Sequence, residues 1–178
     1  MSLDFDSARL PNNALTSEHH EWRAQLRRFF DREVIPYAEE WDENGAIPDE
    51  LWPKSAAVGI LGLGFPEEFG GITEGIDIWH SIILNEEMAR IAVGGITATL
   101  MVHGIGLPPV INFGSEAIKQ LVAPPVLAGA KRISLAITEP GGGSDVARLQ
   151  TTARLDDDHY VVNGSKTYIT GGMNANWF

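Results

Sequence analysis

The N-terminal part of the chain carries apolar residues at steps of three and four. Between Thr16 and Asn44 these positions are Trp22, Leu26, Phe29, Phe30, Val34, Tyr37 and Trp41. Side chains spaced in this way lie on one face of a helix. The pattern predicts a long helix that Thr16 caps and Asn44-Gly45 ends, with a kink at Pro36, which has no amide hydrogen to donate.

Helical spacing continues up to Pro124-Pro125. It predicts helices over residues 49–58, 77–92 and 96–103, a short one from Pro108-Pro109 to Phe113, and one from Ser115 to about Val122. Residues 62–71 are rich in glycine and proline and should form a loop. Because residues 96–103 are apolar nearly all round, we expect that helix to be buried.

The pattern changes from helical to alternating at Arg132. Alternation predicts strands over residues 133–138, 151–155, 160–162 and 166–170. The acidic run Asp156–Asp158 should be a solvated turn. Asn163-Gly164 should be a hairpin turn, because both residues tolerate positive φ. The predicted strands end at the apolar residues Trp177 and Phe178. About four strands would leave an apolar sheet edge unpaired, so we expect the sheet to be incomplete.

We therefore expect an α+β fold with an N-terminal all-α helical domain and an incomplete antiparallel β-domain. The first should cover residues 1–131 and the second residues 132–178. The 178 residues, 44% hydrophobic and 21% charged, suffice for a buried core and exclude disorder throughout.

Charge and composition narrow the function classes. A net charge of −11 disfavours nucleic-acid binding, and the lack of cysteine excludes disulfides, thiolate metal sites and cysteine nucleophiles. Uninterrupted apolar runs stay well short of the roughly 20 residues that cross a bilayer. Acidic residues occur near the N-terminus, at Asp4 and Asp6, where a targeting sequence would carry basic or apolar residues. We expect a cytoplasmic protein.

The segment with the clearest potential for chemistry is a predicted strand that runs into Gly141-Gly142-Gly143. Glycines let the backbone approach a ligand closely and turn its amides outward. With the hydroxyls of Thr138 and Ser144, these amides suit a pyrophosphate or the edge of a flavin ring. A P-loop lysine is lacking, and Val146 stands where a Rossmann fingerprint needs a small residue. A flexible turn that binds nothing is the alternative.

Two segments near the C-terminus carry a family resemblance. They read Thr138-Glu139-Pro140-Gly141-Gly142-Gly143-Ser144-Asp145 and Asn163-Gly164-Ser165-Lys166-Thr167-Tyr168-Ile169-Thr170-Gly171-Gly172. Together they resemble the middle-domain signature of the flavin-dependent acyl-CoA dehydrogenases. Upstream, the loop over residues 65–71 and the helix with Asn85–Arg90 resemble that family's N-terminal helical domain. The family's C-terminal helical domain has no counterpart in the sequence.

The resemblance implies FAD as the cofactor and a set of positions that contact its ring. Thr138 and the backbone of Leu135 and Ile137 would meet the pyrimidine side of the flavin. Tyr168 would lie against one face, although several members of the family have tryptophan there. The Thr170 hydroxyl would hydrogen-bond at N5, where a donor stabilises the reduced ring.

The same resemblance implies contacts for the phosphates and for the substrate. Gly143 and Ser144 would contact the flavin pyrophosphate, and Ser144 also the CoA arm of the substrate. Arg148 stands where the family has a small residue, and it would either crowd the loop or point to solvent. We expect Glu139 to be structural, bonded to loop amides or to a cation.

The implied reaction oxidises a saturated acyl-CoA thioester to the 2,3-enoyl-CoA, a step of fatty acid metabolism, with hydride passing to FAD. An electron-transferring flavoprotein or similar carrier would reoxidise the flavin, and the enzyme would be a homo-oligomer, a dimer or a tetramer. Family members remove the α-proton with a glutamate of the C-terminal domain. No residue of this sequence matches that motif, so we assign no catalytic residue and expect the chain alone to be inactive.

Two other functions are compatible with the sequence. One is a related flavoenzyme, such as an acyl-CoA oxidase or a nitroalkane oxidase. The other is a non-catalytic helical interaction module whose β-tail pairs with a partner.

The remaining polar and apolar candidates have less specific patterns. His80, His103 and His159 lie on three distant segments, and the adjacent His19 and His20 point about 100° apart on a helix. We therefore expect no metal site. Glu86 and Glu87 should be solvated or ion-paired. Leu100-Met101 would line an acyl pocket by family resemblance or belong to the core.

Overall fold

The computed structural model describes residues 3–178. The described chain contains seven α-helices: α1 (Ser17–Glu33), α2 (Ala38–Asn44), α3 (Leu51–Val58), α4 (Ile78–Ala89), α5 (Gly94–Met101), α6 (His103–Phe113) and α7 (Glu116–Leu127). Short 3-10 turns lie at η1 (Asp6–Ala8), η2 (Ile35–Tyr37), η3 (Glu67–Phe69) and η4 (Val146–Arg148). Strands β1 (Thr152–Asp156) and β2 (His159–Asn163) form an antiparallel pair.

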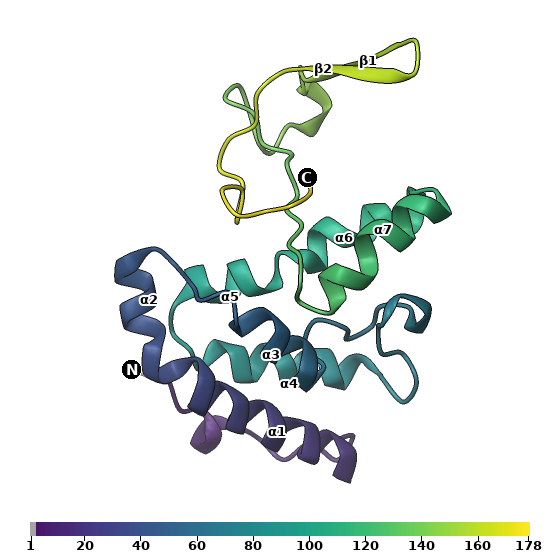
Figure 1. Ribbon diagram of the computed structural model, residues 1–178. Helices are drawn as coiled ribbons and strands as arrows, with labels where there is room; N and C mark the ends of the chain where they lie inside the picture. The colour runs from purple at the N-terminus through teal and green to yellow at the C-terminus, as the bar shows by residue number, and fades with distance from the viewer. Residues whose placement is uncertain (1–2) are drawn as a thin grey trace.

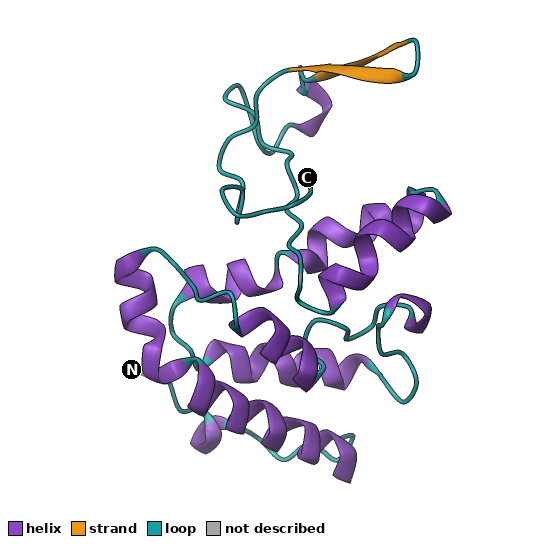
Figure 2. Cartoon of the chain, in the orientation of Figure 1, coloured by secondary structure: helices purple, strands orange, loops and turns teal. Residues whose placement is uncertain are grey.

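The helices form one body, and the segment after α7 extends away from it to the β1–β2 hairpin at the far end (Figure 1). Long loops, with little regular structure, connect the body to that hairpin (Figure 2). The predicted α+β fold class is confirmed. The boundary between residues 131 and 132 stays a prediction.

Proline divides the first predicted helix into two. Helix α1 ends at Glu33, η2 contains Pro36, and α2 continues to Asn44. The proline nitrogen cannot donate to the helix ladder, so the break occurs where the sequence predicts a kink. Thr16 caps α1 by accepting a hydrogen bond from the His19 amide at 3.5 Å, and Gly45 ends α2 with a φ of 63°.

The main core lies between α1 and the helices that cover it. The predicted stripe of α1 is buried at Leu26, Phe29 and Phe30, and it packs with Ile83 and Leu84 of α4. Trp22 and Trp41 are partly buried at the edge of this core. A second, smaller core joins α6 and α7 to the start of the extended segment.

Two expectations for the later helices are wrong. Helix α5 is buried on one face, at Ile96 and Leu100, and not all round. The proline pairs 108–109 and 124–125 lie inside α6 and α7 instead of at helix ends. Buried neighbours explain this, because Leu107 and Val126 pack together in the second core and their burial offsets the lost backbone hydrogen bonds.

One helical run is longer and more apolar than expected. Residues Gly94–Phe113 are long and apolar enough to cross a membrane, by length and composition alone, with a mean hydropathy of 1.3 and 33% of their most apolar stretch buried. A helix in the core of a soluble protein can have the same length and composition. Leu100 and Leu107 within this run belong to the two cores.

The hairpin forms at the acidic turn, as predicted. Asp156 pairs with His159 and Thr152 with Asn163, and Asp157 makes the turn with a φ of 54°. The hairpin turn predicted at Asn163-Gly164 is wrong, because no strand follows β2 in the described chain. Gly164 lies so close to Thr151 that a side chain there would overlap it, and the chain turns away from β2.

Residues 133–138 and 166–170 share single hydrogen bonds instead of a ladder, so the predicted strands are wrong there. The Thr167 amide donates to the Thr138 carbonyl at 2.9 Å, and the Ser134 hydroxyl donates to the Thr170 carbonyl at 2.7 Å. A strand needs a neighbour that continues the hydrogen-bond ladder. In the described chain these two segments meet only at such isolated points, so alternation alone does not make them strands.

Candidate functional site

The glycine-rich loop begins with a tight turn. The amide of Glu139 donates to the carbonyl of Gly142, and the amide of Gly142 donates to the carbonyl of Glu139, each at 3.0 Å. A methyl group at Gly143 would lie 3.3 Å from the Thr138 side chain, so this position leaves little room for a side chain. Residues 140–150 are exposed. The turn thus holds an open backbone loop directly beside the Thr138 hydroxyl.

Glu139 is the anchor of this loop, and its expected structural role is confirmed. The side chain is buried and accepts hydrogen bonds from the amides of Gln150 at 2.7 Å and Thr151 at 2.9 Å, and from the Lys166 ammonium at 2.9 Å. The Thr151 hydroxyl, the Lys166 ammonium and these amides lower the pKa of Glu139 from 4.5 to about 2. A carboxyl held ionised in this way does not serve as a base for a carbon acid at neutral pH.

Two extended segments present the predicted threonines side by side. Thr138 pairs with Thr167, which lies three residues before Thr170. The Ser134 hydroxyl fixes this register by its bond to the Thr170 carbonyl. Both threonines therefore lie on the same pair of neighbouring segments.

Tyr168 combines backbone strain with exposure. Its φ is 56°, in the left-handed region that bulky residues rarely adopt, and the residue is 91% exposed. It lines an open hollow of about 460 Å³ together with Ala136, Lys166, Thr167, Ile169, Gly172, Met173 and Phe178. An aromatic ring held outward at a cost in strain over an apolar hollow is suited to stacking on a flat ligand.

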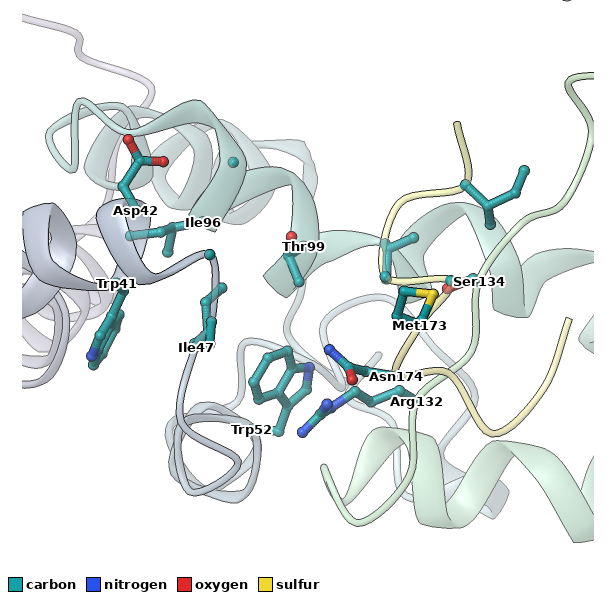
Figure 3. A pocket seen from close by; sticks show the side chains of 17 residues that line it. Trp41, Asp42, Ile47, Trp52, Ile96, Thr99, Arg132, Ser134, Met173 and Asn174 are labelled. Atoms are coloured by element: carbon teal, nitrogen blue, oxygen red, sulfur yellow. The ribbon is translucent and has the colours of Figure 1, made fainter. Parts of the chain in front are cut away.

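A second cavity lies between the helical body and the extended segment (Figure 3). Its volume is about 310 Å³, and its lining includes Trp41, Ile47, Trp52 and Ile96 from the helical body and Ile169 and Met173 from the extended segment. Arg132 lies over the Trp52 ring, 4.0 Å from its centroid, and forms an ion pair with Asp49. The cavity is thus mainly apolar, with one cation at its rim that already has partners.

Comparison with known proteins identifies this arrangement. The model of the acyl-CoA dehydrogenase N-terminal domain matches residues 16–130, and that of the acyl-CoA dehydrogenase middle domain matches residues 134–178. The chain belongs to the acyl-CoA dehydrogenase family. Its relatives include the mitochondrial long-chain specific acyl-CoA dehydrogenase of Sus scrofa, which is 38% identical over 157 residues, 88% of this chain and 36% of that protein.

Solved acyl-CoA dehydrogenase structures resemble the chain closely. A putative acyl-CoA dehydrogenase of Mycobacterium smegmatis has a TM-score of 0.84 and 46% identity, over 92% of this chain and 43% of its own. An acyl-CoA dehydrogenase of Bacillus anthracis, complexed with FAD, has a TM-score of 0.80 and 34% identity, over 94% of this chain and 29% of its own. The chain thus spans less than half the length of these proteins.

In this acyl-CoA dehydrogenase chain, the residues expected to contact flavin fall into two groups. Leu135, Ile137, Thr138, Tyr168 and Thr170 lie on the paired extended segments, and Gly143 and Ser144 lie on the exposed loop that follows. The structure therefore brings the seven positions to neighbouring segments, and their roles stay predictions. The sequence did not indicate Met173 as a site residue, because it belongs to no motif. Met173 is 95% exposed and lines the same hollow as Tyr168.

Arg148 points to solvent. Its side chain is 86% exposed and lies 3.9 Å from Asp145. It lines an open hollow of about 710 Å³ on the loop together with Gly141, Gly142 and Ser165. Arg148 therefore does not crowd the loop in the described chain.

The family resemblance associates Leu100-Met101 with an acyl pocket, but these residues contribute mainly to the core. Leu100 is completely buried in the main core, and Met101 packs against it. Ile96 and Thr99 of the same helix line the cavity of Figure 3. The alternative that these two residues belong to the core is therefore confirmed.

The expectation that the histidines lie apart is wrong for two of them. His19 Nε2 lies 2.9 Å and His80 Nδ1 lies 3.0 Å from the same oxygen of Asp77, and the ring centroids are 4.6 Å apart. The three residues offer ligand atoms within 4.8 Å of one another, which is close enough to hold a metal ion. Each histidine Nδ1 also accepts a backbone hydrogen bond, from Thr16 and from Asp77 respectively.

That hydrogen bonding favours a capping role for the histidines over metal binding. A metal-bound imidazole donates its second N–H to an acceptor. His19 Nδ1 instead receives the Thr16 amide at 3.0 Å, so its proton belongs on Nε2, facing Asp77. The cluster also lies at the starts of both α1 and α4, where the helix dipoles disfavour a cation.

Proposed function

We propose that this chain forms the flavin-contacting part of an FAD-dependent acyl-CoA dehydrogenase that oxidises an acyl-CoA thioester between its α and β carbons. Tyr168 carries the proposal, because it is an exposed aromatic residue in a strained left-handed conformation over an apolar hollow. That hollow adjoins the ribbon that presents Thr138 and Thr170. Bound FAD would supply the hydride acceptor.

The chain's own groups have distinct tasks in this proposal. Tyr168 would stack on one face of the isoalloxazine and restrict its position. The Thr138 hydroxyl would donate at the pyrimidine side of the ring and the Thr170 hydroxyl at N5. The hydrogen bond from Ser134 to the Thr170 carbonyl would keep the two segments in register.

The exposed loop suits the phosphates of the cofactor and the substrate. Backbone amides in the turn region can donate to phosphate oxygens without adding a charge that would have to be desolvated. Gly143 keeps the backbone close to Thr138, and Ser144 adds a hydroxyl donor. We propose Ser144 as the residue shared by the flavin pyrophosphate and the CoA arm.

An acyl chain would find apolar surface in the cavity of Figure 3. Trp41, Trp52 and Ile96 offer such surface on the helical body, and Ile169 offers it on the ribbon that also carries Tyr168. A tail held there would bring the carbons next to the thioester toward the Tyr168 side of the ribbon. We propose this cavity as the acyl site.

Related structures support the cofactor and the substrate class. The Bacillus anthracis enzyme is described as a complex with FAD, and a 30% identical glutaryl-CoA dehydrogenase as a complex with glutaryl-CoA, with a TM-score of 0.82. A 32% identical chain comes from work on the electron transferring flavoprotein of Acidaminococcus fermentans. We accordingly propose acyl-CoA as substrate, an electron-transferring flavoprotein or similar carrier as acceptor, and assembly as a homo-oligomer.

Flavin titration tests the proposal directly. The purified chain is mixed with FAD, and quenching of flavin fluorescence is followed together with the visible absorption band. We expect saturable binding and a shifted, structured flavin band. FMN and riboflavin serve as matched ligands, and weaker binding of these two would show that the pyrophosphate half is recognised. A chain that leaves the FAD spectrum and fluorescence unchanged at high micromolar concentration contradicts the proposal and favours the non-catalytic interaction module.

A further inference from the structure

We propose that Glu139 and Lys166 act as a positioning pair that holds the glycine-rich loop and the Ile137 carbonyl in the arrangement that a flavin needs. The inference rests on the proposed function for its ligand. Neither residue would touch the cofactor. Their task would be to set the loop in place before the ligand arrives, which lowers the ordering cost of binding.

The carboxylate of Glu139 ties two ends of one loop together. Its Oε2 accepts the Gln150 amide at 2.7 Å, and its Oε1 accepts the Thr151 amide at 2.9 Å. These amides lie eleven and twelve residues after Glu139 and close the segment that contains Gly141–Ser144. Because Glu139 also forms the turn with Gly142, both the start and the end of the loop depend on this one residue.

The ammonium of Lys166 connects that loop to the ribbon. It donates to Glu139 Oε1 and to the Ile137 carbonyl, each at 2.9 Å. Lys166 is separated from Ile137 by 29 residues and directly precedes Thr167, whose amide donates to the Thr138 carbonyl. The pair therefore links the loop to both extended segments that carry the predicted ring contacts.

Burial distinguishes this pair from an ordinary surface ion pair. The side chain of Glu139 is 9% exposed and that of Lys166 is 22% exposed. Exposed pairs contribute little to stability, whereas removing one partner of a shielded pair leaves the other uncompensated. Without Lys166, the Ile137 carbonyl would lose the ammonium donor, and Glu139 Oε1 would keep only the Thr151 amide.

The matched variants remove the pair in two ways. Lys166→Met keeps the length of the side chain and removes its donors, and Glu139→Gln keeps the shape and removes the charge. Lys166→Arg restores a cation. Lys119→Met is the control, because Lys119 forms a 2.7 Å ion pair with Glu116 on α7, within the helical body. Each chain is measured for backbone hydrogen exchange without ligand and for FAD affinity by fluorescence quenching.

We expect about tenfold faster exchange at the amides of Gln150 and Thr151 in Lys166→Met and Glu139→Gln, with α1 and α4 unchanged. We expect FAD affinity to fall about tenfold in both variants and to return largely in Lys166→Arg. Lys119→Met should match the wild type. Unchanged exchange in the loop overturns the inference, and so does faster exchange with unchanged FAD affinity. A wild-type chain that binds no FAD overturns the proposed function instead, and the exchange data still decide whether the pair holds the loop.

Discussion

Arg27 donates two hydrogen bonds to Glu87, from Nε to Oε2 and from Nη2 to Oε1, each 3.0 Å long. Glu87 is completely buried between α1 and α4, and it also contacts Arg9, Arg23 and Arg90. The expectation of an ion-paired glutamate is confirmed, and the burial is the new finding. Burial alone would raise the pKa of Glu87, but these guanidinium groups lower it.

The first prediction concerns this buried carboxylate. Glu87→Gln leaves several arginines without their shared partner, so we expect the free energy of unfolding to fall by about 3 kcal/mol. Urea denaturation at neutral pH measures the change. Glu116→Gln, at an exposed ion pair on α7, is the control and should change stability by less than about 0.5 kcal/mol. Equal stability of the two variants would contradict the prediction.

The second prediction concerns pH. Burial would raise the pKa of Asp77, yet the hydrogen bonds from His19 and from the Trp79 amide lower it from 3.8 to about 2. A carboxyl whose pKa is lower in the folded state stabilises the fold above its unfolded pKa and loses that effect as the pH falls toward 2. We expect the melting temperature of Asp77→Asn to depend less on pH between 4 and 2 than that of the wild type.

A second substitution separates charge from capping at the same position. Asn is as good a helix cap as Asp, whereas Ala is not. At pH 7 we expect Asp77→Ala to melt about 3 °C lower than Asp77→Asn. Calorimetry of both variants at pH 7 gives the two melting temperatures. If the two variants melt together, the contact from Asp77 to the Trp79 amide does not stabilise α4.

The third prediction concerns the connection between α7 and the extended segment. Gly129 has a φ of 71°, and a methyl group there would overlap the backbone of Trp52. We expect Gly129→Ala to lower the free energy of unfolding by about 3 kcal/mol. Gly45→Ala is the matched control, with a φ of 63° and open space around it, and it should cost about 1 kcal/mol. A similar cost at both positions would show that φ alone matters.

The fourth prediction sets stability against ligand binding at Tyr168. Glycine relieves the left-handed strain of about 1 kcal/mol or more, and its extra freedom in the unfolded chain offsets part of that gain. We expect Tyr168→Gly to be about 0.5 kcal/mol more stable and to bind FAD about tenfold more weakly. Tyr168→Trp keeps an aromatic face and should bind FAD as the wild type does. Weakened stability in Tyr168→Gly would mean that the ring packs on the protein and is not held for a ligand.

Local patterns predicted those parts of the fold that depend on residues close in sequence. The α1 stripe, the break at Pro36 and the turn at Asp157 arise from helical spacing, a missing donor and turn geometry within a few residues. Glu139 was also predictable as an anchor, because a carboxylate next to a glycine-rich turn has backbone amides within reach. The proline pairs inside α6 and α7 were not predictable, because burial of Leu107 and Val126 outweighs the local signal.

For the candidate site, the motif located the loop and the two threonines, and periodicity alone assigned the wrong structure to their segments. Residues 133–138 have a strand pattern, but a strand exists only where a neighbouring strand completes its ladder. The exposure of Met173 and the left-handed conformation of Tyr168 have no counterpart in the pattern of the sequence.

The sequence by itself determined where α1 begins, where the helix breaks at Pro36 and where the β1–β2 hairpin turns, because each of these is decided by neighbours within one or two turns of chain. Only the tertiary structure decided that His19 meets Asp77 across 58 residues, that four arginines enclose Glu87, and that Lys166 reaches back to Glu139. Such contacts require distant segments to pack together, and their energies depend on burial and on partners that no local pattern specifies.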